Sequence, residues 1–98
     1  MRKIVLRAAL EFGGRADFEI IDVTEKPEGQ KRGTITIDYA PSDILQLKEQ
    51  GMDFDAALEY YRTRIYGLIK YYLSGDWECV EGFDKALEIV ESHIKDAF

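Results

Sequence analysis

The chain has 98 residues, of which 46% are hydrophobic and 33% are charged, and its formal net charge is −6. This length and composition predict one folded domain over residues 1–98 and argue against disorder. The whole acidic excess lies after residue 40, because residues 1–40 carry equal numbers of basic and acidic side chains. A negative domain repels phosphates, so generic binding to nucleic acid or to an anionic membrane surface is disfavoured.

The chain contains one cysteine, Cys79, so an intrachain disulfide is impossible and a reducing compartment is expected. The apolar run that begins at Ile4 is interrupted by Arg7 and Glu11 and is far too short to span a bilayer. The sequence therefore predicts a cytoplasmic protein without a membrane segment.

Residues 1–40 alternate apolar and polar side chains with a period of two, the pattern of half-buried strands. The first strand has an inner face formed by Ile4, Leu6, Ala8, Leu10 and Phe12. The glycines of Gly13–Arg15 favour a hairpin loop, a second strand follows over residues 16–24, and a third covers Thr34–Tyr39. These three strands predict an antiparallel meander.

Residues 41–98 change to helical spacing. Ser42 is the expected N-cap of a short helix that ends near Gly51, and Asp53 is the expected cap of a long helix over residues 54–73. A last helix is expected from Trp77, capped by Asp76, because the apolar residues that follow recur every three or four positions. The expected fold is an α+β two-layer sandwich, with the two long helices as an antiparallel hairpin on one sheet face.

The long helix has more aromatic surface than one core contact needs. Its expected apolar stripe consists of Phe54, Leu58, Tyr61, Ile65, Leu68, Ile69 and Tyr72. On nearly the opposite side lies a second stripe formed by Tyr60, Arg64, Gly67 and Tyr71. Tyrosine and arginine are enriched in protein interfaces, which favours a symmetric dimer or a contact with another protein.

Two alternatives remain open for this second stripe. The short helix around Ile44 can fold over it, which would make it a second core face. The stripe can also line a ligand cleft in which Arg62 and Arg64 bind an anionic group.

The sequence contains no motif for catalysis, a metal or a cofactor. His93 is the only histidine, and an expected helix from Trp77 onward would hold it about 20 Å from Cys79, too far for a catalytic pair. The acidic groups Asp53–Asp55 and Asp76–Glu81 are explained by helix capping rather than by a metal site. We therefore expect a protein that is not an enzyme and holds no metal or cofactor.

Charged surfaces suggest two further interpretations. A basic region near the sheet contains Arg2, Lys3, Arg7, Lys26, Lys31 and Arg32. The expected open face of the sheet has no aromatic side chain on which an RNA base would stack, so a solvated face or a protein contact is favoured. The second interpretation is an inhibitor that mimics nucleic acid through the acidic residues of the last helix. These residues are Glu81, Asp84, Glu88, Glu91 and Asp96.

The leading hypothesis is a small interaction module that associates with itself through the helix over residues 54–73 and acts as an adaptor or regulatory subunit. The nucleic-acid mimic and the binder of a small anion, with or without enzymatic activity, are the alternatives.

Overall fold

The computed structural model describes all residues, 1–98, and contains four strands and three helices. In chain order these are β1 (Arg2–Phe12), β2 (Arg15–Asp22), β3 (Gln30–Asp38), α1 (Pro41–Glu49), α2 (Phe54–Tyr72), β4 (Trp77–Glu81) and α3 (Phe83–Ile94). The strands form one sheet in the order β3-β2-β1-β4. β1, β2 and β3 pair antiparallel as expected, whereas β4 pairs parallel to β1.

The predicted three-stranded meander with a helical hairpin is therefore wrong, because the segment after α2 returns to the sheet. Trp77–Glu81 is a strand, and α2 and α3 are joined through it rather than by a tight loop. Gly82 then begins α3 as its N-cap with φ of +95°, a conformation that glycine adopts without strain. The half-buried Trp77 and Cys79 alternate with exposed neighbours, as expected of a strand. This alternation covers only five residues, so the longer helical spacing of the residues that follow led to the prediction of a helix from Trp77.

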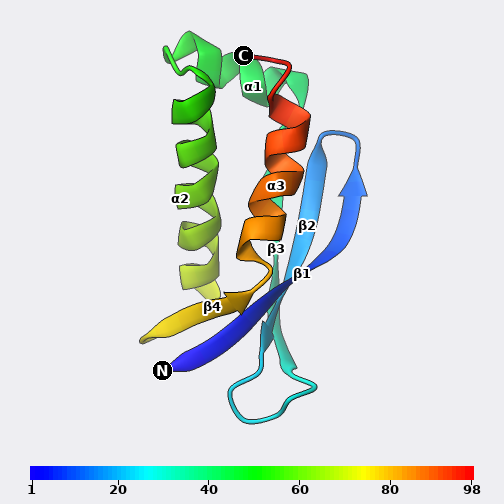
Figure 1. Ribbon diagram of the computed structural model, residues 1–98, viewed down its shortest axis with the longest axis vertical. Helices are drawn as coiled ribbons and strands as arrows, with labels where there is room; N and C mark the ends of the chain where they lie inside the picture. Colours follow the sequence, from blue (N-terminus) through cyan, green and yellow to red (C-terminus); the bar gives the residue numbers. More distant parts are fainter.

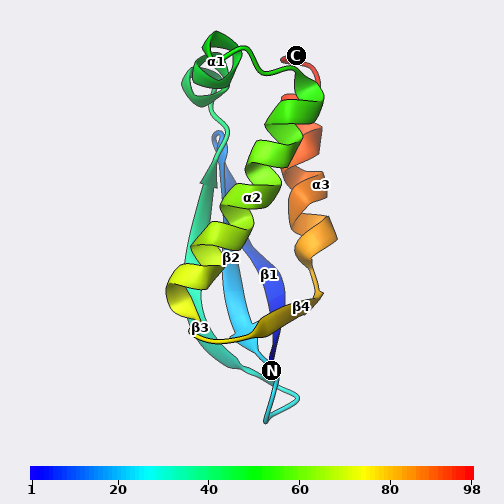
Figure 2. The ribbon, with the colours of Figure 1, turned by 90° about the vertical axis from the view of Figure 1, so that its left-hand side faces the viewer.

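The helices α2 and α3 cover one face of the twisted sheet, and α1 lies at one end of the molecule (Figures 1 and 2). The molecule is elongated, 43 × 25 × 18 Å, with its two termini near opposite ends of the long axis. The core cluster contains 19 buried residues, drawn from β1, β2, β3 and all three helices and from Tyr39 beside β3. None of the helices is both long enough and apolar enough to cross a membrane.

A β-bulge changes the faces of β1 near its end. Ala8 lies opposite Phe18, but Leu10 lies opposite Asp17, so Ala9 is an extra residue without a partner on β2. Beyond the bulge, Glu11 faces the buried Ala16 on the helical side of the sheet. The predicted inner positions of Leu10 and Phe12 are therefore wrong.

Both residues lie on the open face instead, where their side chains are 48% and 73% exposed. The open face thus carries an aromatic residue, Phe12, contrary to the sequence-based expectation.

Two of the three predicted helix starts need correction. Asp53 caps α2 as predicted, since its carboxylate accepts a hydrogen bond from the Ala56 amide at 2.9 Å. The N-cap of α1 is Ala40 rather than Ser42, with Pro41 in the first turn and the Asp43 carboxylate accepting from the Ala40 amide at 3.1 Å. Asp76 caps no helix, because α3 begins six residues later than predicted, at Phe83.

Candidate functional site

Four of the five tyrosines of α2 form two adjacent pairs, and the inner member of each pair binds the edge of the sheet. The hydroxyl of Tyr61 donates to the carbonyl of Asp38 at 2.9 Å, and that of Tyr72 donates to the carbonyl of Thr34 at 3.0 Å. β3 is an outer strand, so these carbonyls lie on an edge that no other strand covers. The inner tyrosines therefore attach α2 to β3 and cover part of that edge.

The outer member of each pair packs edge-on against the inner one. The ring centroids of Tyr60 and Tyr61 are 5.2 Å apart and those of Tyr71 and Tyr72 are 5.4 Å apart, both in T-shaped geometry. Such aromatic pairs contribute about 0.5–1.5 kcal/mol beyond their buried area. Each outer ring is thus held beside a ring that is itself hydrogen-bonded to the sheet.

The predicted stripe of Tyr60, Arg64, Gly67 and Tyr71 lies together on the outer side of α2, along an open groove. The groove has a volume of about 790 Å³, and its remaining lining comes from Met52, Ala56, Glu59, Thr63 and Leu68. No residue of α1 lines this groove, but Asp43, Gln46 and Leu47 of α1 line a second cavity together with Tyr60 and Arg64. The short helix therefore lies beside the first half of the stripe and leaves Gly67 and Tyr71 uncovered. Tyr60 is 38% exposed and Tyr71 is 84% exposed.

Gly67 leaves open space in the groove, and Arg64 has a charge that no ion pair of the chain neutralises. A Cβ added at Gly67 would meet no atom within 4 Å, so the helix surface is open at its centre. Arg64 takes part in none of the ion pairs of the chain. Arg62 lies outside the groove and pairs with Glu59 at 3.4 Å, so the structure does not bring Arg62 and Arg64 together around one anion.

The bulge in β1 produces a side-chain cluster that the sequence analysis missed. It turns Glu11 toward α3, where its carboxylate pairs with Nε2 of His93. The His93 ring stacks on Tyr39 with centroids 4.6 Å apart. Burial raises the pKa of Tyr39, and the nearby Glu11 carboxylate adds to this effect. A helical position of His93 was predictable, but its partner depended on a bulge that alternation does not reveal.

Cys79 and His93 do not share a helix, which corrects the premise of the predicted 20 Å separation. Cys79 belongs to β4 and His93 to α3. The Cys79 thiol donates to the Glu81 carbonyl at 3.3 Å, and burial raises the pKa of this thiol. A raised pKa disfavours the thiolate, the reactive form.

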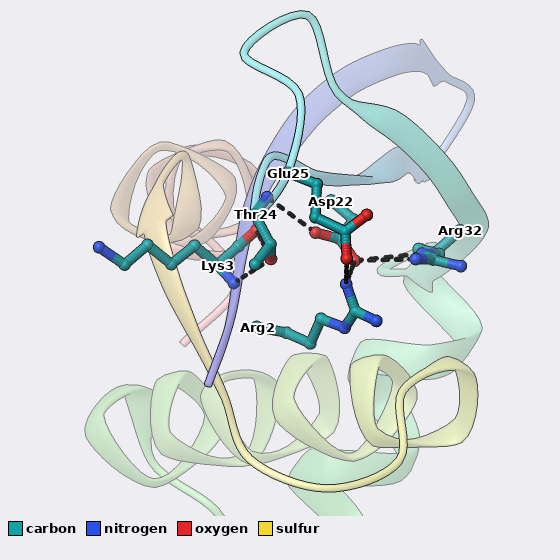
Figure 3. Close-up of polar contacts among 6 residues, drawn as sticks. All are labelled: Arg2, Lys3, Asp22, Thr24, Glu25 and Arg32. Atoms are coloured by element: carbon teal, nitrogen blue, oxygen red, sulfur yellow. Dashed lines mark hydrogen bonds and ion pairs between the residues drawn. The ribbon is translucent and has the colours of Figure 1, made fainter.

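The basic side chains near the sheet are largely neutralised by carboxylates. Asp22 is 4% exposed and accepts from the Thr24 amide and from Arg32, with Arg2 at 3.5 Å, so the three strand ends converge on one carboxylate (Figure 3). The Thr24 hydrogen bond is the main cause of the lowered pKa of Asp22. The Asp22 carboxylate thus has hydrogen-bond and ion-pair partners within the chain, and it links the ends of β1, β2 and β3.

On the open face, Glu19 is placed between Lys31 at 3.1 Å and Arg7 at 3.0 Å. Both interactions lower the pKa of Glu19, that of Lys31 most. The predicted basic region is therefore not a continuous positive surface, since four of its six members face Asp22 or Glu19.

The acidic residues proposed for nucleic-acid mimicry are divided between elements. Asp84, Glu88 and Glu91 lie on α3, but Glu81 ends β4 and Asp96 follows the helix. The predicted continuous acidic face is therefore shorter than expected. The structure also contains no group of three or more histidine, cysteine, aspartate or glutamate side chains arranged to hold a metal ion.

Neither a protein-family model, nor a curated protein, nor a solved structure matches this chain.

Proposed function

We propose that the protein is a non-enzymatic interaction module of the cytoplasm that forms a symmetric dimer through the outer side of α2. In this role it serves as an adaptor or regulatory subunit. The observation that carries the proposal is the exposed groove centred on Gly67, flanked by two tyrosines whose rings are braced by neighbours bound to the sheet.

The spacing of the stripe supports a second copy of the chain as the occupant. Tyr60, Arg64, Gly67 and Tyr71 are separated by four, three and four residues, so the pattern is the same in both directions. A two-fold axis between Ile65 and Tyr66 would pair two α2 helices antiparallel, with each Tyr60 facing the other copy's Tyr71. The same axis places each Arg64 opposite the other copy's Gly67.

This arrangement fits the requirements of a two-fold interface. A two-fold interface uses the same patch on both subunits, and the patch must be complementary to itself. The open space at Gly67 leaves room for the long Arg64 side chain of the other copy, which a larger residue at this position would block. Tyrosine and arginine provide the anchors that most often dominate binding energy. The stripe therefore has both the shape and the residue types for self-association.

The dimer should be weak and concentration-dependent. One helix of 19 residues is about 28 Å long. A pair of such helices buries less than the roughly 1,600 Å² of a standard interface. Dissociation on dilution is thus an expected property of this dimer.

Sedimentation velocity over a concentration series tests the proposal. At high concentration we expect a species of twice the 11.3 kDa monomer mass, which dissociates on dilution. Tyr60→Ala combined with Tyr71→Ala should give a monomer at all concentrations. Gly67→Gln should do the same by filling the centre of the groove, while the open space there lets the monomer fold normally.

Phe12→Ala is the matched control, because Phe12 is an aromatic on the opposite face of the sheet and its 73% exposure lies between those of Tyr60 and Tyr71. Circular dichroism should show that every variant is folded. A wild-type chain that remains monomeric at high concentration would contradict the proposal. A dimer that Phe12→Ala dissociates and the α2 variants do not would contradict it as well.

A further inference from the structure

The sheet has two edges, and side chains of α2 bind part of one of them. On β3, the hydroxyls of Tyr61 and Tyr72 bind the edge carbonyls of Asp38 and Thr34. On the other side, β4 pairs with β1 only from Arg2 to Val5. β1 continues to Phe12, so its second half pairs with β2 on one side and has no strand on the β4 side (Figure 1).

The chain leaves this edge at a defined point. Gly82 turns the backbone away from β1 with φ of +95°, and a Cβ there would collide with the carbonyl of Leu6. That carbonyl therefore faces the β4 side of β1. Because backbone groups in a strand alternate in direction, the N–H and C=O of Ala8 face the same side. Hydrogen-bonding groups of an unpaired edge are a template for a further strand.

A groove lies between this free edge and the first turns of α3. Its volume is about 420 Å³, and its apolar lining comes from Val5, Leu6, Ala8, Phe18, Ala86 and Ile89. An extended peptide beside β1 would place alternate side chains toward this apolar lining.

The charges at the groove differ from those of the whole chain. Arg7 and Lys85 line it together with a single carboxylate, Glu81. Arg7 is occupied by Glu19, whereas Lys85 has no ion-pair partner within the chain. In a domain of net charge −6, Lys85 is the cation at this groove that remains without an ion-pair partner, and it favours a peptide that carries a carboxylate near it.

The bulge disfavours a second copy of β1 as the occupant. The segment of β1 without a strand on its β4 side runs from Leu6 to Phe12, and its centre is Ala9, the bulged residue. Two copies paired antiparallel about that centre would place the two bulges opposite each other and interrupt the ladder. A short strand from a different protein needs only the regular part of the edge before the bulge.

We propose that the free edge of β1 together with the groove beside α3 binds a short extended segment of a partner protein, by addition of a strand to the sheet. The segment has apolar side chains at alternate positions and an acidic residue that reaches Lys85. The two grooves share no lining residue, because α2 and Met52 line one of them, whereas β1, Phe18 and residues between Glu81 and Ile89 line the other. A partner in one groove therefore does not occupy the other.

The test uses a synthetic, end-capped heptapeptide of alternating valine and glutamate, titrated into the isotopically labelled chain and followed by amide NMR shifts. The control peptide has lysine in place of glutamate. We expect saturable shifts at Leu6–Ala8 and at Lys85–Ile89 with the glutamate peptide, and weaker ones with the lysine peptide. Lys85→Glu should weaken binding of the glutamate peptide about tenfold.

Two further variants separate a specific site from a general charge effect. Ala8→Phe fills the groove at an exposed strand position and should abolish the shifts. Lys95→Glu changes the net charge equally, just beyond α3, and should leave binding unchanged. The proposal is overturned by the absence of shifts at millimolar peptide, by shifts confined to α2, or by equal weakening in both lysine variants. Shifts at Leu6–Ala8 that depend on protein concentration without peptide would identify a second copy instead.

Discussion

The hydroxyl of Tyr72 donates a hydrogen bond to the main-chain carbonyl of Thr34, 38 residues earlier in the sequence. The Tyr72 ring also lies against Gly33, where a Cβ would collide with it. Together with Tyr61 at Asp38, this contact binds two carbonyls on the outer side of β3, where no further strand pairs. The tyrosines of α2 thus serve two surfaces, since the inner ones attach the helix to the sheet and the outer ones face solvent.

Removing either inner hydroxyl should destabilise the fold. Tyr61→Phe and Tyr72→Phe each lose one hydrogen bond, for which we expect a decrease of about 0.5–1.5 kcal/mol in the free energy of unfolding in urea. The decrease should be larger for Tyr61, which is buried, than for the partly exposed Tyr72. Hydrogen exchange should also become faster at the amides of β3 in both variants.

Tyr39→Phe is the matched control, because the buried hydroxyl of Tyr39 has no hydrogen-bond partner. Its removal should leave stability unchanged or raise it, since an unpaired buried polar group is unfavourable. Equal losses in all three variants would show that the ring contacts, rather than the two hydrogen bonds, attach α2 to the sheet.

The sequence predicted the first three strands and the first two helices because each has a long and regular pattern. Alternation over Ile4–Ala8 and helical spacing over residues 54–73 extend through several repeats. The period therefore identifies each element even where single residues depart from it. The exposed position of Tyr60 and Tyr71 on one side of α2 follows from the same periodicity.

The missed features depend on single residues and on contacts between distant segments. One extra residue at Ala9 reverses the faces of Leu10 and Glu11, and nothing in the local composition marks that bulge. β4 has five residues and forms only because β1 offers it an edge. The groove between β1 and α3 depends on both the bulge and β4, so the periodicity of the sequence does not predict it.

Gly82→Ala should be among the most damaging single changes in the chain. The substitution forces a side chain into positive φ and against the Leu6 carbonyl, at the junction of β4 and α3. Gly51→Ala is the control, because Gly51 has a similar φ of +85° but open space around it. The control should lose about 1–2 kcal/mol of stability. Gly82→Ala should lose clearly more, as measured by urea unfolding, and similar losses would contradict the close packing of Gly82 on β1.

Acidification should weaken the hydrogen bonds and ion pairs of the Asp22 carboxylate. The pKa of Asp22 is lowered in the folded chain, chiefly by its hydrogen bond with Thr24. A lowered folded pKa gives stability that is present above the unfolded value, near 3.8, and is lost as the pH falls toward the folded value. Asp22→Asn should lower the free energy of unfolding by about 1–3 kcal/mol at neutral pH. The difference from wild type should shrink in acid, whereas Asp96→Asn, at an exposed position, should show neither effect.

Alkaline pH should destabilise the fold through the two buried tyrosines. Burial is the main cause of the raised pKa of both Tyr39 and Tyr61. A raised folded pKa gives stability that is complete below the unfolded value, near 10.0, and is lost as the pH rises through that value toward the folded one. The free energy of unfolding should therefore decrease above about pH 10 through these tyrosines. Burial also raises the pKa of Cys79 from 9.0, so this thiol adds a loss of stability that begins at lower pH. Tyr61→Phe should reduce the alkaline decrease, and an unchanged decrease in that variant would locate the pH dependence elsewhere.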